Sequence, residues 1–102
     1  MDHVNTKDRN SFFDVVAGSE RSQAAVMVLE PGGSTGGADN RHPESDQWLF
    51  VVSGAGTATV EGREFALVAG SLVLIEAGEA HEIACGSGEP LRTINVYAPP
   101  VY

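Results

Sequence analysis

The apolar residues of this chain fall in short runs, and this pattern limits the possible folds more than any other feature of the sequence. The runs are rich in Val, Ile, Phe and Thr, and each is closed by Gly, Pro, Asn or Asp within about ten residues. Short strands joined by turns produce such a pattern, whereas helices of ordinary length need longer runs with a different period. The sequence therefore predicts an all-β fold.

The apolar runs predict where the strands lie. We expect eight strands, at residues 12–16, 23–29, 47–52, 57–60, 64–68, 71–75, 81–85 and 91–97. Residues 61–63 form a short glycine-containing connection of the kind that closes a hairpin. Residues 30–39 contain four glycines and a proline, so we expect a long loop there, at the mouth of the sheets. Strands of this number and length suit a sandwich or a small barrel.

The length and the distribution of apolar residues bound the domain organisation. The chain has 102 residues, of which 42% are hydrophobic, and this predicts one folded domain over residues 1–102. Residues 1–10 are polar and are expected to be loose. No stretch approaches the roughly 18 to 20 uninterrupted apolar residues that a membrane crossing requires, so no membrane partner is expected.

The charge and the cysteine content exclude further classes of partner and location. Six Lys and Arg residues stand against fourteen Asp and Glu residues, and the resulting net charge of −8 repels nucleic acid. The single cysteine, Cys85, cannot form an internal disulfide, and the polar N-terminal residues do not resemble a signal peptide. We therefore expect a cytoplasmic protein that does not bind nucleic acid.

Two segments combine glycine and histidine at characteristic spacings. The first, residues 40–54, reads NRHPESDQWLFVVSG, and the second, residues 70–81, reads GSLVLIEAGEAH. Together they resemble the two signature motifs of the cupin superfamily, in which histidines and a glutamate are followed by glycine, and a glycine-rich turn is followed by histidine. The resemblance covers about residues 31–85. It implies a double-stranded β-helix, a jelly-roll barrel whose interior holds the functional site.

The resemblance also implies a set of site residues. The four metal-ligand positions of the family correspond here to Asn40, His42, Gln47 and His81. All four are expected to bind a ligand, and His42, Gln47 and His81 are expected to hold a metal ion. Three further positions match the family glycines and two depart from its pattern: Gly54, Gly70 and Gly78 match, whereas Glu76 replaces a proline and Cys85 an asparagine.

The replaced ligands leave two interpretations of the pocket open. Divalent transition metals prefer imidazole nitrogen and carboxylate oxygen, and the carboxylate also offsets the charge of the ion. Gln47 offers only a neutral carbonyl oxygen, so one interpretation is a weakened site for Fe, Zn, Mn or Ni. In the other interpretation, His42 and His81 are hydrogen-bonded histidines of a polar pocket without an ion, and the Gln47 amide bonds a ligand or a histidine.

Three functional hypotheses follow from this reading. The first is a single-domain cupin that binds a small molecule beside a degenerate metal site. The second is a metal-dependent enzyme of the dioxygenase, decarboxylase or isomerase type, and the third is a ligand sensor or structural cupin without turnover. A small sandwich has sheet edges to cover, so we also expect a homodimer. Its contacts would involve Phe12, Phe13, Trp48 or Phe50, the last two lying on the strand face opposite Gln47.

Overall fold

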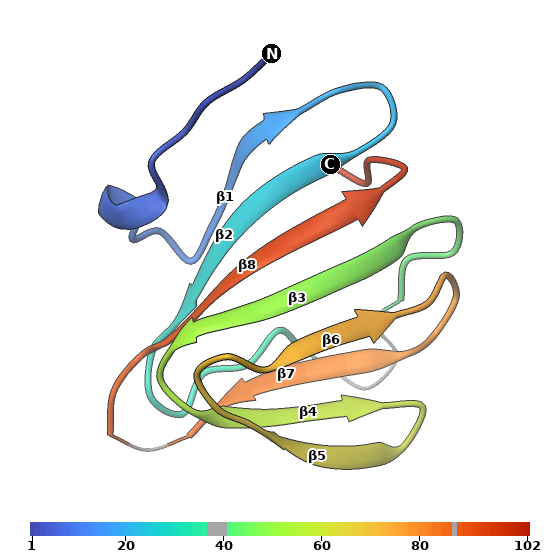
Figure 1. Cartoon of the computed structure of the whole chain (residues 1–102). Coiled ribbons are helices and arrows are strands. Elements are labelled where there is room, and N and C mark those ends of the chain that lie inside the picture. The colour runs from blue at the N-terminus through green and yellow to red at the C-terminus, as the bar shows by residue number, and fades with distance from the viewer. Residues whose placement is uncertain (37–40, 87) are drawn as a thin grey trace.

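The computed structural model describes residues 1–36, 41–86 and 88–102, and it is built from eight strands (Figure 1). These are β1 (Phe13–Gly18), β2 (Gln23–Leu29), β3 (Asp46–Ser53), β4 (Gly56–Val60), β5 (Arg63–Leu67), β6 (Leu72–Ile75), β7 (His81–Cys85) and β8 (Leu91–Ala98). Every predicted strand is present, with ends that differ by one or two residues. Helical structure in the described residues is limited to one 3-10 turn, η1 (Thr6–Asp8), and none of it is long and apolar enough to cross a membrane.

The strands form two antiparallel sheets that face each other (Figure 1). The larger sheet has the order β1-β2-β8-β3-β6 and the smaller sheet the order β5-β4-β7. The last strand, β8, lies between β2 and β3, so strands from both ends of the chain meet at the centre of the larger sheet. This arrangement confirms the predicted all-β jelly roll.

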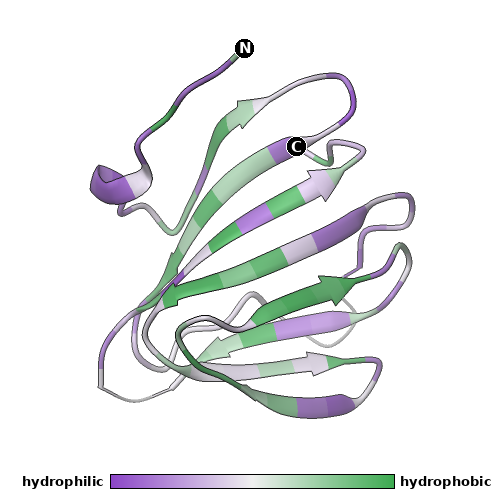
Figure 2. Cartoon of the chain, in the orientation of Figure 1, coloured by the Kyte–Doolittle hydropathy of each residue, from purple (hydrophilic) through white to green (hydrophobic). Residues whose placement is uncertain are grey.

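The inward faces of the strands change character along the length of the sandwich. Towards one end they carry the apolar core, which consists of Met27, Leu29, Leu49, Val51, Ala58, Leu67, Ile83, Cys85 and Leu91. Towards the other end the inward positions of β3 and β7 are Gln47 and His81, both buried. Figure 2 shows this change along β3, which is hydrophobic over its C-terminal half and hydrophilic at its N-terminal end. The apolar end stabilises the fold, and the polar end provides a site.

Part of the predicted glycine-rich loop adds to the smaller sheet. The Thr35 N–H donates to the Ile83 carbonyl over 3.0 Å, and the Cys85 N–H donates to the Gly33 carbonyl over 2.8 Å. The Thr35 hydroxyl oxygen also accepts from the Ile83 N–H, over 3.0 Å. Residues 33–35 therefore run beside β7 at the sheet edge, where a glycine-rich segment costs less than in a ladder interior. The rest of this loop, residues 37–40, lies outside the described residues.

The polar N-terminal segment makes contacts with the larger sheet through Arg92 on β8. The Arg92 Nη1 donates to Asn10 Oδ1 over 2.9 Å, and its Nη2 donates to the carbonyls of Thr6 and Lys7. A planar guanidinium suits this role because it can donate several hydrogen bonds at once. One side chain of β8 thus attaches the 3-10 turn and Asn10 to the sheet.

Candidate functional site

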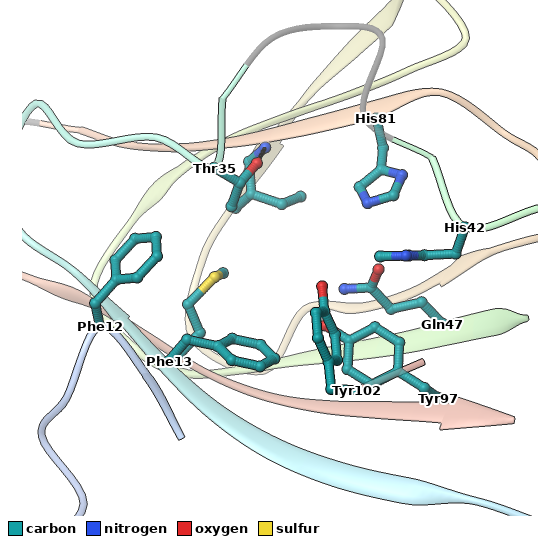
Figure 3. Close-up of a pocket in the computed structure, with 10 residues that line it drawn as sticks. Phe12, Phe13, Thr35, His42, Gln47, His81, Tyr97 and Tyr102 are labelled. Carbon is teal, nitrogen blue, oxygen red and sulfur yellow. Dashed lines mark hydrogen bonds between the residues drawn. The ribbon is translucent and has the colours of Figure 1, made fainter. Parts of the chain in front are cut away.

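A cavity of about 230 Å³ opens at the polar end of the sandwich (Figure 3). Its walls combine polar and apolar side chains from both sheets and from the loops. The polar ones are Thr35, His42, Gln47, His81, Tyr97 and Tyr102, and the apolar ones are Phe12, Phe13, Met27 and Ile83. The structure therefore brings His42, Gln47 and His81 together, although 39 residues separate His42 from His81 in the sequence. Asn40, the fourth predicted ligand-binding residue, lies outside the described residues.

The local fold aims these three side chains at one point. Gln47 is an inward-facing residue near the start of β3, and His81 is the first residue of β7 in the opposite sheet. His42 precedes β3, and its carbonyl accepts a hydrogen bond of 2.9 Å from the N–H of Gly78, which ties its segment to the turn before β7. The two imidazole rings lie 5.1 Å apart between centroids, at an angle of 46°.

A backbone contact orients the ring of His81. Its Nδ1 lies 3.1 Å from the carbonyl oxygen of Glu79. A carbonyl only accepts hydrogen bonds, so Nδ1 donates in this contact, and Nε2 is the ring nitrogen left to act as a ligand. Figure 3 shows the ring of His81 projecting into the cavity towards His42 and Gln47. His81 thus directs its ring into the cavity, with Nε2 not used by the backbone.

His42 is held in its neutral form by its surroundings. Burial lowers the pKa of His42 below the usual 6.5, and the neighbouring His81 lowers it further, whereas the Gln47 side chain acts in the opposite direction. A neutral imidazole has one nitrogen with a free lone pair, which is the form that binds a metal ion. His42 therefore matches His81 as a potential ligand.

Gln47 presents an oxygen that has no partner. The side chain is only 4% exposed, and its Nε2 donates to Asn95 Oδ1 over 3.2 Å. Asn95 in turn donates from Nδ2 to the Thr93 hydroxyl oxygen over 3.0 Å, so the amide of Gln47 is oriented by a short chain of hydrogen bonds. Among the described residues, no group meets the geometry of a hydrogen bond to Gln47 Oε1, although the Gln47 side chain lies close enough to His42 to raise the pKa of that ring. A buried acceptor without a partner costs about 1–3 kcal/mol, which indicates that something else binds there.

Sequence reasoning missed the chain of hydrogen bonds behind Gln47. Thr93 and Asn95 are fully buried on β8 and face the interior with Leu91 and Tyr97. The alternation of residues in the predicted strand 91–97 contains this signal, because positions 91, 93, 95 and 97 share a face. Two polar residues at inward positions of a central strand mark a polar network rather than an apolar core.

The carboxylates of Asp46 and Glu79 are close in sequence to Gln47 and His81, but they accept hydrogen bonds outside the cavity. Asp46 Oδ1 accepts a hydrogen bond of 3.0 Å from the N–H of Ala77, and Glu79 Oε1 accepts one of 2.6 Å from the N–H of Glu76. Both side chains are outside the buried interior, as is Glu44. Within the described ranges, no cluster of three or more His, Cys, Asp or Glu side chains is placed to hold a metal ion. A metal site here would have to use the amide oxygen of Gln47.

The two imidazole rings are nevertheless spaced as they would be on a single divalent ion. Metal–nitrogen bonds of about 2.0–2.1 Å place the centroids of two imidazoles on one tetrahedral ion roughly 5 Å apart. The observed separation of 5.1 Å agrees with this value. The unpartnered Gln47 oxygen supplies a third donor, and further coordination positions would stay open to a ligand. None of the three donors brings a negative charge, so they do not offset the positive charge of an ion.

Aromatic rings line the cavity beside His42, whose ring centroid lies 5.3 Å from that of Tyr97. The ring of Tyr102 lies 4.8 Å from Phe13 and 5.3 Å from Tyr97 between centroids. Gln23 holds Tyr102 in place, because its Nε2 donates to the Tyr102 carbonyl over 2.8 Å and its Oε1 accepts from the Tyr102 N–H over 2.9 Å. Burial, together with the Tyr102 side chain, raises the pKa of Tyr97, so its hydroxyl stays neutral and able to donate a hydrogen bond.

The lowered pKa of His42 predicts a pH-dependent stability of the metal-free protein. The unfolded chain binds a proton near pH 6.5, whereas the folded chain does so only at lower pH. The free energy of unfolding therefore falls as the pH drops through this window. Urea unfolding at about pH 7.5 and about pH 5.5, with a chelator present, measures the fall, which we expect to be smaller in His42→Asn. The exposed His3→Asn controls for the loss of a histidine, and an equal fall in His42→Asn would contradict the prediction.

Comparison with known proteins identifies the family to which this chain belongs. The family model described as "Cupin domain" matches residues 25–97. L-ectoine synthase from Mycobacterium sp. (strain KMS) is 40% identical over 55 residues, which are 52% of this chain and 41% of that protein, so the chain spans about two fifths of the relative.

Solved structures share the fold over nearly the whole chain. BH2720 from Bacillus halodurans has a TM-score of 0.87 at 26% identity, and the match covers 95% of this chain and 76% of that one. KdgF from Halomonas sp. has a TM-score of 0.78 at 21% identity over 87% of this chain and 78% of that one, which is a likeness of fold alone. Because the family model covers well over half of its residues, the chain belongs to the cupin family.

Proposed function

We propose that this protein binds a small molecule in its cavity, beside a divalent metal ion held by His42, Gln47 and His81. The observation that carries the proposal is the buried Oε1 of Gln47, which has no partner of hydrogen-bond geometry among the described residues and lies beside the imidazoles of His42 and His81. Lone pairs that converge without donors favour a cation between them. An ion bound there would act as a Lewis acid that attracts an oxygen of the ligand.

The remaining walls determine what else fits. The cavity of about 230 Å³ is below the 300–1,000 Å³ typical of pockets for drug-sized ligands, so the ligand is a small metabolite. Phe13, Met27 and Ile83 offer it apolar contact and exclude water. The hydroxyl-bearing rings of Tyr97 and Tyr102 line the same cavity. These features support binding of a compact molecule with one polar end.

An enzyme is the second candidate, and two observations favour it. The curated relative is named as a synthase, and two imidazoles and one amide would leave open positions on an ion for a substrate. A metal-dependent dioxygenase, decarboxylase or isomerase would use such positions. Turnover by the metal-loaded protein that disappears in His81→Ala would favour the enzyme, and saturable binding without turnover would favour the binding module.

Metal content tests the proposed function directly. We expect protein purified without a histidine tag to bind Fe(II), Zn(II), Mn(II) or Ni(II) at one site per chain. Binding should weaken at least about tenfold in His81→Ala, because an imidazole ligand is lost. Elemental analysis and calorimetric titration measure this, and His3→Ala removes an exposed histidine far along the chain as the matched control. Equal binding by wild type and His81→Ala would contradict a metal site at this place.

We also propose that a second copy of the chain covers an exposed apolar face of the larger sheet. Its residues are Trp48, Phe50 and Val52 on β3 and Leu72 and Leu74 on β6, each more than 40% exposed. In the sheet, Trp48 pairs with Leu74 and Phe50 with Leu72, so the side chains form one continuous patch. Phe12 and Phe13, also expected as dimer contacts, line the cavity, and Phe12 is exposed as well.

The dimer has a simple test. Phe50→Lys places a charge in the centre of the patch, and we expect it to convert the dimer to a monomer at micromolar concentration, because burying an unpaired charge is costly. Light scattering measures the mass in solution. Phe65→Lys is the matched control, since Phe65 is an exposed phenylalanine on β5 in the smaller sheet. A wild-type monomer, or a Phe50→Lys dimer, would contradict the proposal.

A further inference from the structure

The proposed ion would lie in a cavity that does not compensate its charge. Of the described residues that line it, none is Asp, Glu, Lys or Arg. The proposed ligands are two imidazoles and, at residue 47, an amide where a carboxylate would have carried a negative charge. Two positive charges would therefore be surrounded by neutral donors and by aromatic and aliphatic side chains.

Such an arrangement is unfavourable unless a negative charge accompanies the ion. Moving a charge from water into a medium of low dielectric constant costs several kcal/mol unless an opposite charge or good ligands offset it. Among the described residues, the carboxylates of Asp46 and Glu79 do not line the cavity and accept hydrogen bonds from backbone N–H groups of the turn before β7. The described lining residues therefore leave the charge of the ion to be offset by the ligand.

We propose that the small-molecule ligand is a carboxylate whose negative charge completes the metal site, so that ion and ligand bind cooperatively. This rests on the metal-binding function proposed above and names the ligand class of the same cavity. The carboxylate takes the place of the protein carboxylate that residue 47 lacks. The ion alone and the ligand alone should each bind weakly, and each should strengthen the other by the same factor, as thermodynamic linkage requires.

The shape of the cavity indicates the rest of the ligand. Phe13, Met27 and Ile83 also line the cavity and favour an apolar body. Tyr97 and Tyr102 also line the cavity, and a tyrosine hydroxyl is a group that can donate a hydrogen bond to a carboxylate oxygen. A volume of about 230 Å³ admits a single ring or a short branched chain beside the ion. A carboxylate with a compact apolar body, such as an aromatic acid, meets all three conditions.

Matched probes separate the effect of charge from the effect of shape. Zn(II) is titrated calorimetrically into the wild-type protein with no addition, with benzoate, and with benzamide, which has the same shape without the charge. A titration of Zn(II) into benzoate alone corrects for association in solution. We expect benzoate to strengthen zinc binding at least about tenfold, within the range typical of coupled sites, and benzamide to leave it unchanged within about twofold.

The Gln47→Glu variant tests whether the missing protein carboxylate is the cause. With a carboxylate at residue 47 the ion is already compensated, so zinc should bind tightly without benzoate and the benzoate effect should fall below about threefold. A thermal unfolding scan of each mixture gives a second readout, because a ligand that binds the folded state raises Tm, and raises it further the tighter it binds.

Each result decides between the proposals. Zinc binding by the wild type that is equally strong with benzoate, with benzamide and with neither overturns the carboxylate inference and leaves the metal-binding function standing. Zinc binding that is absent in the wild type under all three conditions overturns the metal-binding function. A benzoate effect of equal size in wild type and Gln47→Glu overturns the role assigned to Gln47, and with it the inference.

Discussion

Replacing Gln47 by Glu strengthens the binding of a divalent ion by about tenfold or more, equivalent to ~1.4 kcal/mol. The variant keeps the length and shape of the side chain and adds a negative charge beside His42 and His81, whose rings lie 5.1 Å apart. The buried surroundings tolerate the change, because the Asn95 amide can rotate and donate from Nδ2 to the new carboxylate. The Thr93 hydroxyl can then donate to Asn95 Oδ1.

Calorimetric titration of Fe(II), Zn(II), Mn(II) and Ni(II) into both proteins measures the change. Gln47→Leu is the matched control: it removes the unpartnered oxygen and should lose affinity for the ion without losing the fold. In a pocket without an ion, the introduced carboxylate would instead lower the stability or raise the pKa values of the histidines. Unchanged or lost affinity in a folded Gln47→Glu protein would therefore contradict the metal site.

Replacing Gly54 by Ala lowers the free energy of unfolding by about 2–5 kcal/mol, a large share of the stability of a small domain. The backbone of Gly54 has a φ of +87°, a left-handed conformation that costs a residue with a Cβ atom about 1–2 kcal/mol. In addition, an added Cβ would lie 2.2 Å from the carbonyl oxygen of Pro90, and relieving this overlap moves backbone at a cost of about 1–3 kcal/mol.

Gly62 provides the matched control for this substitution. Its φ of +78° is similar, but no atom lies within 4 Å of the Cβ position, so Gly62→Ala should cost only the conformational part, about 1–2 kcal/mol. Urea unfolding of the two variants and the wild type gives the difference between them. Equal losses in Gly54→Ala and Gly62→Ala would show that the close approach of residues 54 and 90 does not contribute.

The strands and their inward faces could be predicted from the sequence, because the patterns that produce them involve residues close together in the chain. Apolar residues at alternate positions and turn residues between them specify a strand wherever it pairs, and all eight strands formed as expected. The same alternation placed Gln47 and His81 on inward faces and Trp48 on the outer face, as observed. The motif resemblance then indicated that the inward positions of β3 and β7 face one cavity.

Contacts between distant parts of the chain decided how the side chains of the site are oriented and hydrogen-bonded. Asn95 orients Gln47 from 48 residues away, and Gln23 holds Tyr102 from 79 residues away. The glycine-rich segment that ends at Thr35 joins the sheet edge through Ile83, again 48 residues away.

The sequence by itself determined the all-β class and the positions of the strands, because strand periodicity and turn residues act over short distances. The resemblance of its motifs to those of cupins indicated the jelly roll, with His42, Gln47 and His81 among its candidate site residues. Only the tertiary structure decided that Gln47 Oε1 is left without a partner among the described residues and that no charged side chain of those residues lines the cavity. Hydrogen bonding and electrostatic compensation depend on distances in space, and these exist only once strands far apart in the chain have paired.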